Sequence, residues 1–405
     1  MSIKVVVTGL GLVTPVGVGR ADTWSSLLAG ESGIEEVRSF DTSRHSAHLG
    51  GEVKAIIEPP LERLPESIGR ATRLAVTAAR EALEDAGLAI DGAEDDPRFG
   101  VAMGTTSGEP GLVEELDDRW LDGELGQLGG DFIGHYPCHV IAAHLGEEFG
   151  AAGPNVMLPA ACAAGNYAVG YALDALRHGR ADVMLAGGAD AFSRITYTGF
   201  ARLGAIAPER CQPFDRDRKG MVPGEGAAVL VLEREQDARR RGARIYAEVA
   251  GYGLSCDAHH MTAAHPQGDG AARAMRQALE SAGLEAGDVS YVSAHGTGTP
   301  TNDKLETRAL MQVFGEHAKS LPTSSIKSMI GHTMGAASAI ESCVSVLAIN
   351  DGRVPPTINY QEPDPECPLD CVPNEARELT VDVVMNNAYA FGGNNASVIF
   401  RRLAA

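Results

Sequence analysis

Short apolar runs alternate with segments of helical periodicity from one end of the chain to the other. Residues 3–8 form a continuous apolar run typical of a buried strand, and residues 70–88 carry apolar side chains at helical spacing, with a terminating glycine at position 87. The alternation continues in the second half, where a helical pattern over 271–282 precedes an apolar run over 289–294. Such alternation favours helices packed in layers on sheets, the α/β class.

The order of predicted elements also suggests two halves. Each half runs strand, helix, strand, helix, and an arginine-rich helix end and turn separates them near position 244. We therefore predict an N-terminal half over residues 1–244 and a C-terminal half over residues 245–405. A chain of 405 residues with 44% hydrophobic and 22% charged residues can bury a large core, either as separate domains or as one bilobal body.

The charge balance excludes several classes of partner. There are 54 acidic against 34 basic side chains, which gives a formal net charge of −20. A chain this acidic repels phosphate backbones and anionic lipids, so we expect neither nucleic acid nor membrane as a partner. No apolar run approaches the roughly 20 residues that span a bilayer, and the first residues lack the features of a signal peptide. The sequence therefore predicts a cytoplasmic protein.

Several motifs that resemble metal or nucleotide sites are incomplete. The seven cysteines are an odd number and widely spread, so they are interpreted as free thiols. Cys367 and Cys371 lack companion ligands at zinc-site spacing, and we predict no metal there. Gly9 and Gly11 follow the first strand, but Thr14 stands where a dinucleotide fingerprint needs its third glycine. We therefore expect neither a metal ion nor a nucleotide.

A cysteine surrounded by small residues is the first strong functional signal. Residues 158–166 read Leu-Pro-Ala-Ala-Cys-Ala-Ala-Gly-Asn, and helical spacing of apolar side chains begins directly afterwards. Cys162 is thereby expected at a helix N-terminus, where free amides and the helix dipole stabilise a thiolate. A buried packing cysteine is the alternative, and the segment alone favours neither.

Two histidines stand in loops rich in glycine and small polar residues. His295 closes an apolar run and precedes Gly-Thr-Gly-Thr-Pro, and His332 ends the segment Lys-Ser-Met-Ile-Gly-His. Taken singly, each is equally consistent with a structural role. Catalytic residues concentrate on loops held by a rigid scaffold, and one cysteine with two such histidines is a set suited to covalent catalysis.

The series of motifs along the whole chain resembles the β-ketoacyl-acyl-carrier-protein synthases, the elongating ketosynthases of the thiolase superfamily. The matching segments are residues 5–11, 40–43, 213–215, 224–227, 355–359 and 391–395, in addition to the cysteine and histidine segments. The resemblance implies a thiolase-like α/β fold. In this fold, two pseudo-repeated βαβαβαββ halves form a five-layered α/β/α/β/α arrangement.

The resemblance also implies a role for each residue of the catalytic set. Cys162 takes the growing acyl chain as a thioester. His295 and His332 promote decarboxylation of the malonyl extender, and as neutral imidazoles they donate hydrogen bonds to the enolate that forms. Lys327 supports the two histidines through a buried polar network. The carboxylates of that network are Asp303, Glu306 and Glu341.

Further positions concern the substrate. The resemblance makes Phe391 an aromatic gate whose amide joins that of Cys162 in an oxyanion hole, and it makes Thr297 and Thr299 partners of the phosphopantetheine arm. Ser107 matches a position in the wall of the acyl pocket. Because serine is smaller and more polar than the branched apolar residue often found there, we expect long, unsaturated or partly oxidised acyl chains to be accepted.

Docking of an acidic carrier needs a basic patch on this acidic protein. The family's docking arginine is displaced, and Gly204 stands at the equivalent position. Four arginines are the candidates that remain: Arg63, Arg70, Arg73 and Arg202. The alternative is that these side chains are solvated or paired with Glu62 and Glu66.

The implied reaction is a decarboxylative Claisen condensation, in fatty-acid or type II polyketide biosynthesis. An acyl group on Cys162 joins malonyl-acyl-carrier protein, giving a 3-oxoacyl-carrier protein and CO2. No bound cofactor is expected, because phosphopantetheine arrives on the acyl carrier protein, and the family association is a homodimer or a heterodimer with a related ketosynthase-like subunit. Two alternatives stay open: a non-catalytic subunit that sets chain length, and an acyltransferase or decarboxylase that forms no carbon–carbon bond.

Overall fold

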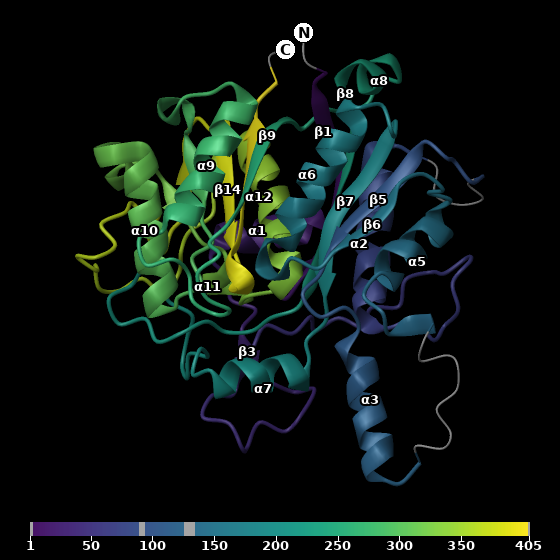
Figure 1. Ribbon diagram of the computed structural model, residues 1–405, viewed down its shortest axis with the longest axis horizontal. Coiled ribbons are helices and arrows are strands. Elements are labelled where there is room, and N and C mark those ends of the chain that lie inside the picture. The colour runs from purple at the N-terminus through teal and green to yellow at the C-terminus, as the bar shows by residue number, and fades with distance from the viewer. Residues whose placement is uncertain (1–2, 89–93, 125–133, 404–405) are drawn as a thin grey trace.

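The computed structural model describes residues 3–88, 94–124 and 134–403 (Figure 1). Its central sheet has eleven described strands: the short β2 (Gly17–Val18) pairs only with β1, and the other ten fall into two sets of five along the chain. The first set is β1 (Val5–Thr14), β5 (Phe99–Gly104), β6 (Asn155–Leu158), β7 (Val183–Asp190) and β8 (Gly226–Arg234). The second set is β9 (Ala247–Cys256), β10 (Tyr291–Ser293), β11 (Thr323–Ser324), β14 (Val383–Tyr389) and β15 (Asn394–Arg401).

The two sets have the same topology. The first runs β6-β5-β7-β8-β1 across the sheet, and the second runs β11-β10-β14-β15-β9. In each set the first three strands are parallel, and the last two pair antiparallel. The sets meet where Val5–Val7 pairs antiparallel with Ala247–Val249. One α/β topology thus occurs twice, first in the strands up to β8 and again in the strands from β9 onward.

Helices cover both outer faces and fill the space between the two sets of strands (Figure 1). The outer helices of the first half are α2 (Arg70–Ala86) and α5 (Val140–Phe149), and those of the second half are α9 (Asp269–Ala282) and α10 (Pro300–Phe314). Between the sheets lie α6 (Ala164–Arg177) and α12 (Ala337–Asp351), which pack against each other and against strands of both halves. The result is the five-layered α/β/α/β/α arrangement that was predicted.

The central helix α12 is buried on all sides, unlike the outer helices α2 and α9. Residues 337–349 of α12 are all buried, whereas α2 and α9 bury one face. A helix that is apolar all round is typical of a core position between two layers. Close approach is built into the pair, since a Cβ on Gly165 of α6 would lie 2.4 Å from the backbone nitrogen of Ala339 in α12.

The first strand is longer than the sequence pattern predicts. It runs on to Thr14, so Gly9 and Gly11 lie within the strand and not in a turn. A Cβ on Gly9 would come within 2.0 Å of the Ala82 carbonyl oxygen, and one on Gly11 within 1.8 Å of the Ala78 carbonyl oxygen. The glycine pair therefore lets α2 pack directly on β1.

The parallel strands of both halves send their carboxyl ends toward one region. Cys162 follows β6, Asp190 ends β7, His295 follows β10 and Phe391 follows β14. Ligands of open α/β sheets bind at the carboxyl ends of strands. Among the described residues, no helix is both long enough and apolar enough to cross a membrane.

Candidate active site

Cys162 lies in a single turn that links β6 to α6. The 3-10 turn Ala161–Ala163 precedes the helix directly, and Ala161 takes a left-handed conformation with φ of 48°. A non-glycine residue in that region is uncommon and marks a constrained backbone. The Cys162 side chain is 8% exposed and faces a cavity of about 350 Å³. The predicted position at a helix start is confirmed.

His332 faces the sulfur of this cysteine. Its Nε2 atom lies 3.0 Å from Cys162 Sγ, and its Nδ1 atom accepts a hydrogen bond of 3.2 Å from the Met334 amide. Burial, and then the nearby Lys327 charge, hold the pKa of His332 well below its ordinary value, so the ring is neutral. A neutral imidazole whose Nδ1 accepts carries its proton on Nε2. His332 therefore directs an N–H toward Cys162.

His295 completes a compact group. Its ring centroid lies 5.5 Å from that of His332 at an interplanar angle of 85°, and 5.7 Å from that of Tyr389. Its buried Nδ1 has no hydrogen-bond partner among the described residues. Burial and Lys327 lower the pKa of this imidazole as well. Two neutral imidazoles beside one thiol form a site suited to an oxyanion, which needs donors and a site shielded from water.

The cysteine itself is a thiol at neutral pH. Burial raises the pKa of Cys162 to about 12, and the Lys327 charge lowers it only in part. Burial works against the thiolate that the helix start was expected to stabilise, because desolvation disfavours the charged form of the sulfur. Attack by sulfur therefore requires the thiol proton to leave as the new bond forms.

This protonation state predicts an unusual pH profile for alkylation. With a pKa of about 12, the thiolate fraction of Cys162 increases about tenfold per pH unit throughout the range from pH 7 to 10. The rate of iodoacetamide labelling of the Cys162 peptide, followed by mass spectrometry, should rise in parallel without a plateau. A small thiol with a pKa near 8.5 levels off in the same series. A plateau for Cys162 below pH 9 would contradict the assignment.

The predicted polar network divides into two parts. Lys327 forms a buried ion pair with Glu341, whose pKa burial raises to about 7. Glu306 accepts hydrogen bonds from the amides of His295 and Gly296, both at 2.8 Å, and burial raises its pKa to about 8. Lys327 supplies the charge near both histidines, and Glu306 holds the backbone of one of them.

Asp303 stabilises the outer part of this network. It accepts hydrogen bonds from the Phe214 amide at 2.8 Å and the Gly298 amide at 3.2 Å, and Arg218 lies 3.6 Å away. It thereby fixes the loop that follows His295. Among the described residues, no hydrogen bond or ion pair joins Asp303 to Lys327, so Asp303 belongs to the scaffold and not to the group around the sulfur.

The substrate residues line the same cavity as Cys162. Thr297 and Thr299 share a hydrogen bond of 2.9 Å between their hydroxyls, and both face the cavity. Phe391 is 43% exposed at the mouth, and its ring centroid lies 5.7 Å from that of Phe200. The expected gate, arm-binding residues and nucleophile are therefore arranged along one path from the surface to the sulfur.

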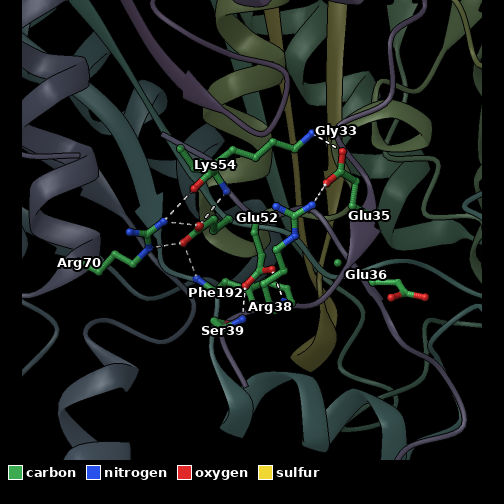
Figure 2. Close-up of a pocket in the computed structure, with 12 residues that line it drawn as sticks. Gly33, Glu35, Glu36, Arg38, Ser39, Glu52, Lys54, Arg70 and Phe192 are labelled. Carbon is green, nitrogen blue, oxygen red and sulfur yellow. Dashed lines mark hydrogen bonds and ion pairs between the residues drawn. The ribbon is translucent and has the colours of Figure 1, made fainter. Parts of the chain in front are cut away.

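Three of the four candidate docking arginines form ion pairs with carboxylates of this chain. Arg70 forms an ion pair of 2.6 Å with the buried Glu225 at a second cavity, where other charges are paired as well (Figure 2). Arg63 pairs with Asp95 and Arg73 with Glu66. For Arg73, the alternative that it pairs with Glu66 is confirmed.

Arg202 is exposed at the end of α7 (Arg194–Arg202), directly before the cavity-lining Leu203 and Gly204. An exposed lysine that sequence reasoning missed, Lys219, also lines the mouth. Neither cation has an ion-pair partner in the part of the chain that the structure describes.

Ser107 lies in the loop that follows β5, beside Asp190. It does not line the cavity that holds Cys162. Its amide donates to Asp190 at 2.9 Å, and its hydroxyl lies 3.3 Å from that of Thr196. Sequence reasoning missed Asp190, although an acidic residue that ends an apolar strand after two glycines was a visible signal.

The central three side chains also have the donors of a metal site. Ligand atoms of Cys162, His295 and His332 lie within 4.8 Å of one another. Thiolate and imidazole suit zinc, but a sulfur ligand must first lose its proton. Binding an ion there would require Cys162 to lose a proton that burial favours keeping.

Solved structures define the class of this fold. An ishigamide ketosynthase/chain length factor matches with a TM-score of 0.95 and 42% identity, and each chain is covered completely. A type II PKS ketosynthase, in complex with its acyl-carrier protein and bound to a hexaketide, matches with a TM-score of 0.92 and 34% identity over the full length of both chains. The fold is that of the thiolase-like ketosynthases.

Sequence relatives narrow the class to a family. The Beta-ketoacyl synthase N-terminal domain matches residues 3–238, and the Beta-ketoacyl synthase C-terminal domain matches residues 246–361. The 3-oxoacyl-[acyl-carrier-protein] synthase 2 of Coxiella burnetii is 40% identical over 410 residues, 99% of each chain. That of Staphylococcus aureus is 40% identical over 412 residues, covering 100% of this chain and 99% of the relative. The chain belongs to the beta-ketoacyl synthase family.

Proposed function

We propose that this protein condenses an acyl thioester held on Cys162 with malonyl-acyl-carrier protein, releasing CO2 and a 3-oxoacyl-carrier protein. The observation that carries the proposal is the 3.0 Å approach of His332 Nε2 to Cys162 Sγ, with a neutral second imidazole beside them. A thiol gives a place to hold one acyl group. The two imidazole N–H groups can hold the enolate that forms from the malonyl substrate.

In the first half-reaction, Cys162 Sγ attacks the thioester carbonyl of an acyl carrier. A new carbon–sulfur bond forms on the enzyme, the bond to phosphopantetheine breaks, and the thiol proton of Cys162 ends on the departing pantetheine sulfur. The Nε2–H of His332 stabilises the negative charge that develops on Sγ during this exchange. The arm itself would lie along Thr297 and Thr299.

In the second half-reaction, the malonyl group loses CO2 and its thioester oxygen becomes an enolate. His332 and His295 donate hydrogen bonds to that oxygen, and the enolate carbon attacks the acyl carbonyl on Cys162. The carbon–sulfur bond to the enzyme breaks, and a proton restores the Cys162 thiol. No bound cofactor takes part in this scheme, because phosphopantetheine arrives with each substrate.

The two rival functions differ in products. A non-catalytic chain-length-setting subunit would form no acyl-enzyme, and an acyltransferase or decarboxylase would release no 3-oxoacyl product. The test is to incubate the protein with acyl-carrier and malonyl-carrier substrates and to identify carrier-bound products by mass spectrometry. A 3-oxoacyl carrier two carbons longer than the acyl substrate supports the proposal. Acyl-enzyme or CO2 without that product would exclude it.

The partners are an acyl carrier protein and a second ketosynthase-like chain. Solved structures similar to this chain include a ketosynthase in complex with its acyl-carrier protein and a ketosynthase in complex with its chain length factor. In the described chain, β6 is the last strand of the sheet and leaves one edge unpaired, a feature that favours pairing with another chain. We place this chemistry in fatty-acid or type II polyketide biosynthesis, in the cytoplasm.

Docking of the carrier should depend on Arg202. A carrier that is acidic meets a protein of net charge −20, so the unpaired cation beside the mouth provides local attraction. Arg202→Glu should raise KM for carrier-bound substrates about tenfold while leaving kcat within twofold. Arg180→Glu is the matched control, because Arg180 is equally exposed but follows the far end of α6. Equal KM values for the two variants would place docking elsewhere.

A further inference from the structure

Asp190 is a buried carboxylate for which the proposed mechanism has no use. It ends β7, is 1% exposed, and lies between the loop after β5 and the turn that follows His332. Burying a carboxylate is costly unless hydrogen bonds compensate. The cost is visible in its pKa, which burial raises to about 6 in spite of four hydrogen bonds that lower it.

Each carboxylate oxygen of Asp190 accepts two hydrogen bonds. Three of the four donors lie in the loop after β5, and the fourth lies in the turn after His332. Oδ1 accepts from the Thr105 hydroxyl and the Ser107 amide, each at 2.9 Å. Oδ2 accepts from the Thr106 amide at 2.8 Å and from the Gly335 amide at 2.6 Å. One carboxylate thus joins the loop after β5 to the turn that follows His332. His332 is itself 142 residues further along the chain than Asp190.

The turn that Asp190 holds is constrained. Met334 has a left-handed φ of 52°, and the 3-10 turn Met334–Ala336 packs against the turn that carries Cys162. A Cβ on Gly335 would meet the Thr105 carbonyl carbon at 2.5 Å and Asp190 Oδ2 at 2.6 Å, so only glycine fits. A strained turn of this kind persists where its surroundings over-determine it.

The same turn determines which ring nitrogen of His332 carries the proton. The Met334 amide donates to Nδ1 of His332, and the next amide, that of Gly335, donates to Asp190. Two successive amides therefore aim in fixed directions, one at the carboxylate and one at the imidazole. If the anchor at Gly335 is lost, the strained φ of Met334 can relax and its amide can leave Nδ1.

We propose that Asp190 is a positioning residue, which holds the Met334–Gly335 turn so that His332 keeps its proton on Nε2, facing the reacting atoms. The inference rests on the proposed function, because the Nε2–H matters most when it meets the enolate. Acyl loading makes a smaller demand on it, since the charge on sulfur is transient. Asp190 should therefore influence condensation far more than loading.

Asp190→Asn is the informative change, because the side chain keeps its size. With its NH2 group at the Oδ1 position, the amide faces the Ser107 N–H and the Thr105 hydroxyl, which can turn to accept; with the NH2 group at the Oδ2 position, it faces the N–H groups of Thr106 and Gly335. Either orientation therefore loses at least one amide hydrogen bond and leaves the Gly335 amide facing a neutral oxygen or a donor in place of a carboxylate. We expect kcat for condensation to fall about 10²-fold, the cost of a small misplacement of a reacting group. Acyl loading of Cys162 should stay within about threefold, because removing the Asp190 charge also removes an influence that raises the Cys162 pKa.

Glu148→Gln is the matched control. Glu148 is 3% exposed, accepts hydrogen bonds from the amides of Glu62 and Arg63, and pairs with Arg80, but it lies on α5 away from the cavity. It is the same kind of amide-binding buried carboxylate, so its loss should lower the melting temperature without separating the two half-reactions. Thermal denaturation of both variants accompanies the assays.

Histidine 15N NMR of the full protein tests the tautomer directly, with His332 assigned by its loss in His332→Asn. The unmodified enzyme should show a protonated Nε2 and an unprotonated Nδ1 at His332, and Asp190→Asn should shift both resonances toward a tautomer mixture. A protonated Nδ1 in the unmodified enzyme overturns the inference even if the variant does not fold. Equal losses in loading and condensation, or a profile like that of Glu148→Gln, also overturn it. An unmodified enzyme that loads acyl groups but forms no 3-oxoacyl product contradicts the proposed function instead.

Discussion

Cys162→Ala should abolish acyl transfer from carrier to enzyme. Removing a covalent nucleophile costs on the order of 10⁶ in rate, so labelling should fall to background. The measurement is intact-protein mass spectrometry after incubation with an acyl-carrier thioester, where the unmodified enzyme gains one acyl mass. Among the cysteines, only Cys162 stands 3.0 Å from an imidazole nitrogen in a cavity that opens to the surface.

Cys367→Ala is the control for this experiment. Cys367 is 1% exposed and packs in the core around α9 and α10, so acyl loading should be unchanged although some stability is lost. An acyl adduct that persists in Cys162→Ala, at whichever residue, would falsify the covalent mechanism.

His332→Ala should reduce condensation about 10²- to 10³-fold, the usual cost of losing one donor to a developing oxyanion. Loading of Cys162 should fall by a smaller factor, because the enolate is formed only in the second half-reaction. The two rates are separated by measuring acyl-enzyme formation without malonyl carrier, and product formation from enzyme that has already been acylated. His332→Asn keeps an N–H donor and should recover part of the lost rate.

Substitution of an exposed histidine provides the comparison. His317 lies in the short 3-10 turn Gly315–Lys319, away from the cavity. The variant His317→Ala should therefore leave acyl loading and condensation unchanged. If His332→Ala condensed at the rate of His317→Ala, the role assigned to His332 in enolate stabilisation would be wrong.

Local patterns in the sequence determined the layers and the candidate residues. Helical spacing over 70–88 corresponds to α2, and the small-residue segment around Cys162 corresponds to the turn that begins α6. His295 was found because it closes an apolar run, and His332 because it ends a glycine-containing segment that begins at Lys327. These predictions succeed because burial of one helix face or one strand is a property of neighbouring residues.

The meeting of Cys162, His295 and His332 was predicted from resemblance and not from local pattern. Nothing within a few residues of Cys162 identifies a partner 170 positions away. The same limit explains the errors at Gly9 and Gly11, whose conformation depends on α2, and at Arg70, whose charge is taken up by Glu225.

The sequence by itself determined which elements form, where the thiol and imidazoles stand along the chain, and the family to which they point. Only the tertiary structure decided the state of those groups. Burial makes Cys162 a thiol, the Met334 amide selects the His332 tautomer, and Asp190 joins two loops that are remote in sequence. Protonation depends on desolvation and on donors brought together by folding, and these are properties of the packed site rather than of any segment.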